Sequence, residues 1–374
     1  MPNSWKPLLA LLAAMALVLA ACGDSDDETE AGRTAGTESA TSTTQAGTGG
    51  ASPSSSAPAP TGNCASEEVV CVGLVTDVGK VDDKSFNQSA WEATQQAAGD
   101  LGAQANFIET TAATDYRTNI NSFADQDYDV IVTVGFALGE ATLAAATEHP
   151  DIDFIGVDQR QGDPMPNVAG VVFPEDRAGF MAGALAGLLT ESDLVASVLG
   201  TNLVPAVVAF GEGFANGVKH TNPDAQVITT YHPGGLDVAF ADPSWGAETA
   251  RQAIDQGADV IFGAGGSTGN GALAEIAKEN GDVFCIGVDK DQWESLPEAH
   301  PCLVTSAMKL IPPAVVELIN ASVEGRFPAG DFVGDVGLAP YHDFDDEVPD
   351  DVKTQVEEIT EGVLSGQIPT GYTP

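Results

Sequence analysis

Basic residues are scarce in this chain: 14 lysines and arginines stand against 55 aspartates and glutamates, which gives a formal charge of -41 at pH 7. A surface this acidic repels phosphate groups, so nucleic acid and anionic membrane surfaces are excluded as partners. Anionic ligands such as nucleotides are disfavoured for the same reason. Because cations are so few, a lysine inside an apolar segment is unusually informative here.

The motifs of the common cofactor enzymes are also missing. No G-x-G-x-x-G follows a predicted strand, no Walker loop is present, and no C-x-x-C pair has the spacing of a metal site. The 5 histidines are scattered without ligand spacing. We therefore expect neither a cofactor nor a metal.

Long apolar runs are absent except at the N-terminus. Residues 8–21 form a charge-free apolar run after Lys6, too short for the roughly 20 residues of a membrane span. The run ends in Leu-Ala-Ala-Cys at residues 19–22, which resembles the lipobox of bacterial lipoproteins; an ordinary secretory signal is the alternative. We expect residues 1–21 to be a lipoprotein signal peptide and Cys22 to carry the lipid anchor, on the extracytoplasmic side of the cell membrane.

Residues 22–63 contain almost no large apolar side chains and are rich in Ser, Thr, Gly and Pro. Such a segment cannot bury enough surface to order itself, so we predict a disordered stalk. The four cysteines after it allow three pairings in an oxidising compartment, and four free thiols are the alternative. Closeness in sequence, and two apolar segments that are candidate neighbouring strands, favour the pairs Cys64–Cys71 and Cys285–Cys302.

From residue 69 onward, short Val- and Ile-rich runs alternate with Ala-rich helical stretches. This alternation is typical of βαβ units and a largely parallel sheet, so the predicted fold class is α/β. One helix is expected to begin near residue 86, with Ser85 or Asn87 as its N-cap. The predicted strands are 69–76, 104–108, 130–134, 154–157, 168–172, 194–199, 226–230, 260–262, 283–288, 303–306 and 332–337.

An internal repeat divides this pattern into two similar halves. DVIVTVGFALGE at residue 129 and DVIFGAGGSTGN at residue 259 each lead through a glycine loop and an Ala-rich helix to a strand that ends Ile-Gly-Val-Asp. Two such units predict two lobes, and two lobes facing a cleft are typical of a receptor that closes on a small ligand. Chance similarity of two generic βαβ units is the alternative.

Acidic residues end several predicted strands. Asp77, Asp158 and Asp289 each follow an apolar run, at the sheet edge where α/β proteins bind ligands. Carboxylates there accept hydrogen bonds from hydroxyl or ring N–H groups, although each aspartate is also a candidate cap for the next helix.

Two aromatic residues and one lysine stand in polar surroundings near these ends. Phe86 and Phe240 lie in polar loops of different halves and are candidates to sandwich a planar group, with Trp245 as a substitute for Phe240. Phe86 is equally suited to filling the core under its own helix. Lys309 ends an apolar run and is a candidate partner of Asp289, or simply a lysine extending to the surface.

A glycine-rich loop also matches an enzyme motif. Residues 265–269, Gly-Gly-Ser-Thr-Gly, fit the G-x-S-x-G nucleophile elbow between a strand and a helix. An acyl hydrolase would use Ser267, with Asp289 and His300 or His342. The first half of the repeat has no serine at this position, and small residues equally suit close approach of backbone N–H groups to a ligand.

Taken together, TDVGKVDDKSFNQSAWE, the two IGVD strand ends, FADPSWG, AGGSTGNG and TSAMK resemble the basic membrane protein family. Its members are solute-binding lipoproteins of ABC importers, and the best understood are purine-nucleoside receptors. The resemblance runs from residue 69 to about 338. It implies a type I periplasmic-binding-protein fold, with two doubly wound parallel-sheet lobes joined by a three-segment hinge.

The resemblance also implies domain ranges and residue roles. Residues 64–172 with about 305–330 would form the first lobe, and residues 173–304 with about 331–374 the second. Phe86 and Phe240 would stack on a base whose edge bonds Asn87 and Asp158. The ribose would be held by Asp77, the Gly266 backbone, Asp289 and Lys309.

The function expected from these features is that of a monomeric receptor, not an enzyme. It would bind a nucleoside and deliver it to an ABC permease with a separate ATPase subunit. A sugar receptor is the nearest alternative, because rings and acids also suit pyranoses, and the Ser267 hydrolase is the alternative from another class.

Overall fold

The computed structural model describes residues 64–66, 68–279 and 282–374, which all belong to one structural unit. The predicted signal peptide (1–21), the predicted lipidation site Cys22 and the predicted stalk (22–63) lie outside the described residues. Within the described ranges, no helix is both long and apolar enough to cross a membrane.

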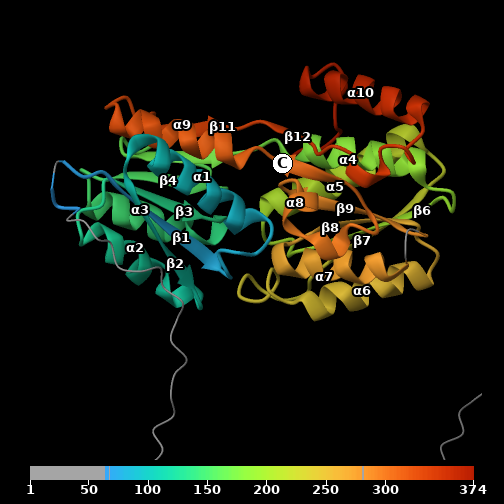
Figure 1. The fold of residues 1–374 in the computed structure, drawn as a ribbon, viewed down its shortest axis with the longest axis horizontal. Helices are drawn as coiled ribbons and strands as arrows, with labels where there is room; N and C mark the ends of the chain where they lie inside the picture. Colours follow the sequence, from blue (N-terminus) through green and yellow to red (C-terminus); the bar gives the residue numbers. More distant parts are fainter. Residues whose placement is uncertain (1–63, 67, 280–281) are drawn as a thin grey trace, which may run out of the picture. The chain divides into compact units, whose positions relative to one another are not determined.

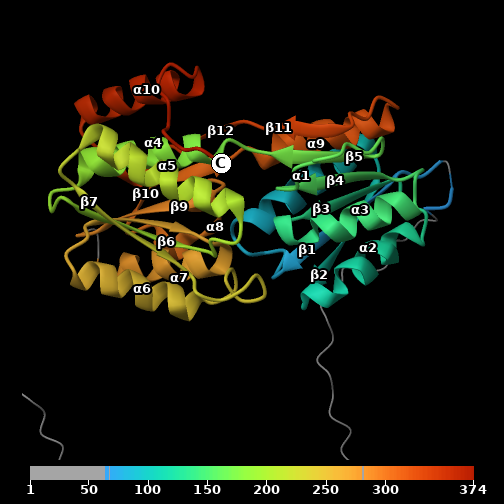
Figure 2. The ribbon, with the colours of Figure 1, turned by 180° about the vertical axis from the view of Figure 1, so that it is seen from behind.

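These residues form two six-stranded sheets, each with helices on both faces (Figure 1; Figure 2). In order of pairing, the first sheet contains β11 (Gly330–Val333), β5 (Val168–Val172), β4 (Asp153–Val157), β3 (Val130–Val134), β1 (Cys71–Val78) and β2 (Gln104–Thr110). The second contains β12 (Val336–Leu338), β10 (Leu303–Lys309), β9 (Phe284–Asp289), β8 (Val260–Ala264), β6 (Leu194–Leu199) and β7 (Gln226–Tyr231).

Parallel pairing explains the sequence pattern. All neighbouring strands are parallel except β10 and β12, which are antiparallel. Strands of a parallel sheet are covered on both faces, so they appear as continuous apolar runs, and every residue of β3 and β8 is buried. The predicted α/β class with two doubly wound lobes is therefore confirmed.

The helices divide between the two sheets. Those of the first lobe are α1 (Phe86–Leu101), α2 (Tyr116–Ala124), α3 (Gly139–Glu148) and α9 (Ile311–Val323). Those of the second lobe are α4 (Glu175–Leu189), α5 (Pro205–Thr221), α6 (Pro243–Asp255), α7 (Gly266–Ile276), α8 (Gln292–Ser295) and α10 (Asp350–Leu364). The largest buried cluster of apolar side chains includes residues of both lobes, so the lobes share core packing.

Three crossovers join the lobes: β5 to α4, β10 to α9, and β11 to β12. They are bonded to one another, because Gly334 N–H donates to the Val172 carbonyl (2.9 Å) and Leu310 N–H donates to the Asp335 carbonyl (2.9 Å). This is the three-segment hinge that the sequence predicts.

The third crossover corrects one predicted strand. Residues 332–337 are not a single strand, because they divide between β11 in the first sheet and β12 in the second. A Cβ atom at Gly334, where the chain crosses, would lie 2.4 Å from the Phe173 ring, so only glycine fits there. The lobe ranges shift accordingly, since β10 stays in the second sheet to Lys309 and β11 belongs to the first.

Each lobe contains one disulfide next to its strands. Cys64 is bonded to Cys71 at the start of β1, and Cys285 in β9 is bonded to Cys302 just before β10. These are the two pairs that the sequence favours.

Candidate ligand-binding site

A cavity of about 330 Å³ lies at the carboxyl ends of strands from both sheets. Ligands of α/β proteins bind at such edges, because the loops that follow the strands converge there. All eight residues proposed from the sequence line this one cavity: Asp77, Phe86, Asn87, Asp158, Phe240, Gly266, Asp289 and Lys309.

On the first lobe, the end of β1 is joined to the first turn of α1. Asn87 Nδ2 donates to Asp77 Oδ1 over 2.9 Å. The side-chain oxygen of Asn87, Oδ1, is buried and has no hydrogen-bond partner among the described residues, so it remains available as an acceptor. Burial raises the pKa of Asp77 to about 7, against the opposing effect of the Asn87 hydrogen bond.

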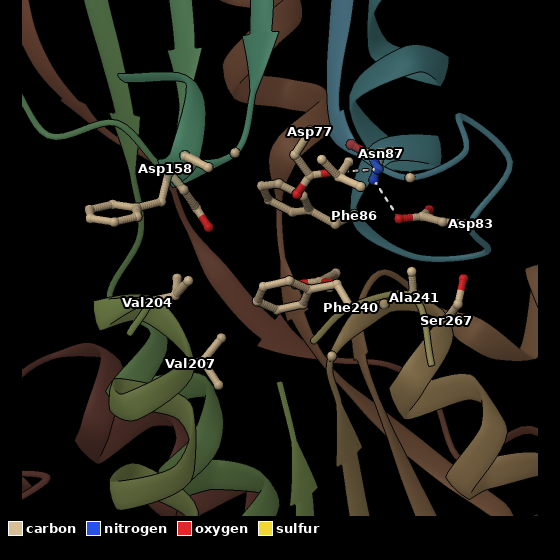
Figure 3. Close-up of a pocket in the computed structure, with 18 of the residues that line it drawn as sticks. Asp77, Asp83, Phe86, Asn87, Asp158, Val204, Val207, Phe240, Ala241 and Ser267 are labelled. Atoms are coloured by element: carbon tan, nitrogen blue, oxygen red, sulfur yellow. Dashed lines mark hydrogen bonds between the residues drawn. The ribbon is translucent and has the colours of Figure 1, made fainter. Parts of the chain in front are cut away.

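Ser85, one of the two residues predicted from the sequence, stands at the N-cap position of α1, but its side chain makes no capping hydrogen bond. The Asp83 carboxylate makes these bonds instead. Asp83 Oδ1 accepts from the N–H groups of Ser85 (2.9 Å) and Gln88 (3.1 Å). Asp83 Oδ2 accepts from the N–H group of Asn87 (3.0 Å; Figure 3). A carboxylate satisfies several N–H groups at once and suits the positive end of the helix. Burial raises the pKa of Asp83 to about 6.

Ser85 instead reaches the other lobe. Its hydroxyl donates to Asp289 Oδ2 over 2.7 Å. Burial raises the pKa of Asp289, whereas Lys309 and the Ser85 hydrogen bond act in the opposite direction. Ser85, directly before α1, thus holds an aspartate at the end of β9.

Lys309, at the end of β10, also bonds across the lobes. Its Nζ lies 2.5 Å from Asp158 Oδ2 and 3.4 Å from Glu175 Oε1, rather than in the predicted pair with Asp289. Burial lowers the pKa of the ammonium, but the carboxylates of Asp158, Glu175 and Asp289 outweigh it and raise the pKa, so the lysine stays charged. Asp158 Oδ1 is buried and has no hydrogen-bond partner in the described part of the chain.

Three aromatic rings surround this ammonium. Nζ lies 4.9 Å from the ring centroid of Phe86, 5.5 Å from that of Phe210 and 5.7 Å from that of Phe173. These are cation–π distances. Phe86 therefore lines the cavity and contacts the buried lysine, and its ring also packs against the apolar core.

The repeat places two aspartates in the same rare backbone conformation. Asp158 and Asp289, each the last residue of IGVD, have φ angles of 60° and 67°. Residues other than glycine seldom adopt this left-handed conformation, although aspartate does so more readily than most, and strained backbone of this kind clusters at functional sites.

Phe86 and Phe240 lie on opposite sides of the cavity, one from each lobe (Figure 3). Gly266 lets the Phe240 main chain approach closely. Its φ is 55°, and a Cβ atom there would lie 3.1 Å from the Phe240 carbonyl oxygen. Trp245 does not line the cavity and packs 4.5 Å from the His232 ring, so it does not substitute for Phe240.

An apolar wall of the cavity was missed from the sequence. Its second-lobe part comes from the start of α5, which follows β6, and from the loop after β7, so the same attention to the connections after strands leads to it. Its first-lobe part includes an aromatic residue of the repeat's glycine loop. The apolar and aromatic residues of this wall include Val204, Val207, Phe210, Leu236, Tyr116 and Phe136.

The groups of a hydrolase are not brought together. Ser267 lines the cavity, but no histidine does so among the described residues. The ring of His300 bonds the Trp293 carbonyl (2.7 Å) and that of His342 bonds Asp291 (2.7 Å). The described ranges also contain no group of three or more His, Cys, Asp or Glu residues that could hold a metal ion.

Two lobes, three crossovers and a cavity between strand ends define a solute-binding receptor of the type I periplasmic-binding-protein fold. The family model of PnrA-like ABC transporter substrate-binding proteins matches residues 70–336, and the chain belongs to this family. The resemblance to basic membrane proteins seen in the sequence is thereby confirmed.

Similar proteins agree with this assignment. The chain is 32% identical to a CD4+ T-cell-stimulating antigen of Listeria innocua, over 98% of each chain. It is 28% identical to the ABC transporter nucleoside-binding protein BmpA of Lactococcus lactis, over 79% of this chain and 87% of that one. A solute-binding protein of an Aeropyrum pernix ABC transporter has the same fold, with a TM-score of 0.71 and 25% identity over 80% of this chain and 92% of that one.

Proposed function

We propose that this protein captures a purine nucleoside in the cavity between its lobes and delivers it to the permease of an ABC importer, which a separate ATPase subunit drives. The observation that carries the proposal is the placement of Phe86 and Phe240, one from each lobe, on opposite sides of a cavity whose other walls hold carboxylates and an amide. A flat base with a polar edge matches that arrangement. The nucleoside-binding name of the Lactococcus relative supports it.

The residue roles follow the resemblance. The two rings stack on the faces of the base, and Asn87 and Asp158 bond its edge. Asp77, the Gly266 backbone, Asp289 and Lys309 hold the ribose.

Two hydrogen bonds connect these sets, because Asn87 bonds Asp77 and Lys309 bonds Asp158. Each bond joins a proposed base contact to a proposed ribose contact. The base and the ribose would therefore be bound by side chains that are hydrogen-bonded to one another, rather than by two separate subsites.

The mechanism is closure without covalent chemistry. A ligand that contacts residues of both lobes stabilises the closed arrangement over open ones, and this differential binding moves the hinge. The receptor would act as a monomer, held to the outer face of the cell membrane by a lipid on Cys22.

Calorimetric titration with inosine, guanosine, adenosine, cytidine and ribose tests the proposal. We expect at least one purine nucleoside to bind at least about tenfold more tightly than ribose, since stacking and base-edge bonds add to the ribose contacts. Tight binding of a monosaccharide with no response to nucleosides would favour the sugar receptor instead. Hydrolysis of a chromogenic ester, lost in Ser267→Ala, would favour the hydrolase.

A further inference from the structure

The loop at residues 82–85 of the first lobe is bonded by polar side chains of the second lobe. Three donors reach two main-chain carbonyl groups, and none of the three donor residues lines the ligand cavity. The bonds run from Asn270 Nδ2 to Asp83 O (2.7 Å), from Gln292 Nε2 to Lys84 O (3.2 Å) and from Ser295 Oγ to Lys84 O (2.8 Å).

The loop is shaped to present these carbonyl groups. The Asp83 carboxylate accepts from the N–H groups of Ser85, Asn87 and Gln88, which fixes the loop against the first turn of α1. Lys84 has a left-handed backbone with φ of 63°. Its carbonyl oxygen accepts two bonds from the second lobe.

The donor groups of the second lobe are also held in place by bonds within that lobe. Gln292 is fully buried, and its Oε1 accepts from the Val288 N–H over 2.9 Å. The amide can satisfy that N–H only in this orientation, so Nε2 must point toward Lys84. Nε2 also donates to Asn270 Oδ1 over 2.8 Å, which ties two of the three donors together.

We propose that Asn270, Gln292 and Ser295 form a main-chain latch, a set of positioning residues that stabilises the closed lobes and so sets ligand affinity without touching the ligand. This inference rests on the proposed function for the identity of the ligand, but not for the latch contacts themselves.

The chemistry of the latch suits a highly acidic protein. Each bond joins an uncharged amide or hydroxyl donor to a main-chain carbonyl, so closure through them adds no repulsion and is insensitive to salt. An ionic contact between the lobes differs in this respect: Lys290 Nζ lies 2.7 Å from Glu92 Oε2, and these side chains are 13% and 45% exposed. Salt screens a pair that is partly exposed, so this contact should contribute little.

The latch makes a prediction that direct ligand contacts do not. Because the latch bonds only protein atoms, its loss should lower the affinity for every ligand by the same factor. Removing two neutral hydrogen bonds corresponds to about tenfold weaker binding. Truncating Phe86, by contrast, should weaken nucleosides far more than ribose.

The test is calorimetric titration of the double variant Asn270→Ala/Ser295→Ala with every ligand that the wild type binds. Ser244→Ala, an exposed hydroxyl on α6 of the same lobe, is the matched control. We expect a uniform loss of about tenfold, unchanged by 0.5 M salt, and faster amide hydrogen exchange in residues 82–88 of the ligand-bound protein. Glu92→Gln should change affinity less than about twofold.

Unchanged affinity in the double variant, or losses that differ more than about threefold between ligands, would overturn the latch. If the double variant does not fold, Ser295→Ala alone carries the test, with an expected uniform loss of about threefold. If the wild type binds no nucleoside and no ribose, the proposed function fails. The latch is then decided by hydrogen exchange of residues 82–88 without ligand: faster exchange in the variant supports it, and equal exchange removes it.

Discussion

The two halves of the internal repeat share a backbone but use their last residue differently. Residues 129–158 form β3, α3 and β4, residues 259–289 form β8, α7 and β9, and each half ends in a left-handed aspartate. Asp158 is bonded by the charged Lys309, whereas Asp289 is bonded by the neutral Ser85 hydroxyl.

In both cases the bonding group comes from the opposite lobe. Lys309 belongs to the second sheet and contacts the first lobe, and Ser85 belongs to the first lobe and contacts the second. The repeat therefore supplies two equivalent bridging points, one ionic and one neutral. The comparison shows that the same strand–helix–strand unit can place an aspartate at the same position twice. The group that bonds the aspartate then determines whether the contact is a salt bridge or a neutral hydrogen bond.

The largest effect is expected from the ionic bridge. Lys309→Met leaves Asp158 and Glu175 buried without their cation, so we expect the free energy of unfolding to fall by about 3–5 kcal/mol in urea titrations. Lys278→Met removes a cation whose side chain is 67% exposed and should cost less than about 1 kcal/mol. Equal losses in the two variants would show that the buried lysine has no special part.

Neutralising the two aspartates should change stability in opposite directions. Asp158→Asn breaks the charge pair with Lys309 and should lower the free energy of unfolding by about 2 kcal/mol, because Glu175 remains as a partner. Asp289→Asn keeps an oxygen that accepts from Ser85 and removes a carboxylate whose pKa is raised by burial, so at pH 8 it should be neutral or slightly stabilising. Thermal unfolding of both variants without ligand checks the contrast, and shifts of the same sign would contradict it.

The pH dependence of stability should reveal the other carboxyl groups whose pKa is raised on folding. Folding raises the pKa of Asp77 from 3.8 to about 7. A raised carboxyl pKa gives stability that is complete below the unfolded value and is lost as pH rises through the folded value. Between pH 5.5 and 8 this amounts to about 2 kcal/mol, and Asp83 and Glu175, with pKa values of about 6 and about 7, act in the same direction.

The ligand-free protein should therefore be less stable at pH 8 than at pH 5.5 by urea titration. Asp77→Asn should remove about 2 kcal/mol of that decline. A decline of the same size in the variant would mean that Asp77 is not the titrating group.

The smallest contrast concerns the disulfides. Cys64 and Cys71 are 7 positions apart and Cys285 and Cys302 are 17 apart, so chain entropy predicts that the second disulfide stabilises the fold by about 0.8 kcal/mol more than the first. Replacing each pair by serine and comparing unfolding in urea measures that difference. A larger loss for the Cys64–Cys71 pair would run against the entropic account.

Much of this site can be predicted from strand ends and the repeat, because both are local patterns. Asp77, Asp158, Asp289 and Lys309 follow apolar runs, and the topology alone brings such positions to one edge. The partners could not be predicted, since Ser85 and Asp289 are 204 residues apart and Asp158 and Lys309 are 151 apart.

Other features were hidden for related reasons. Glu175 resembles any acidic residue in the first turn of a helix, and nothing in its neighbours along the chain reveals a buried lysine. The break at Gly334 falls inside an apolar run, where only the Phe173 ring explains the glycine.

The central claim is that a planar group is held between aromatic rings of the two lobes. Its most direct test is calorimetric titration of the wild type, Phe86→Ala and Phe240→Ala with one purine nucleoside and, in parallel, with ribose. The account predicts that each variant binds the nucleoside at least about tenfold more weakly, near 1.4 kcal/mol, while ribose affinity changes much less. Nucleoside affinity unchanged in both variants would contradict it.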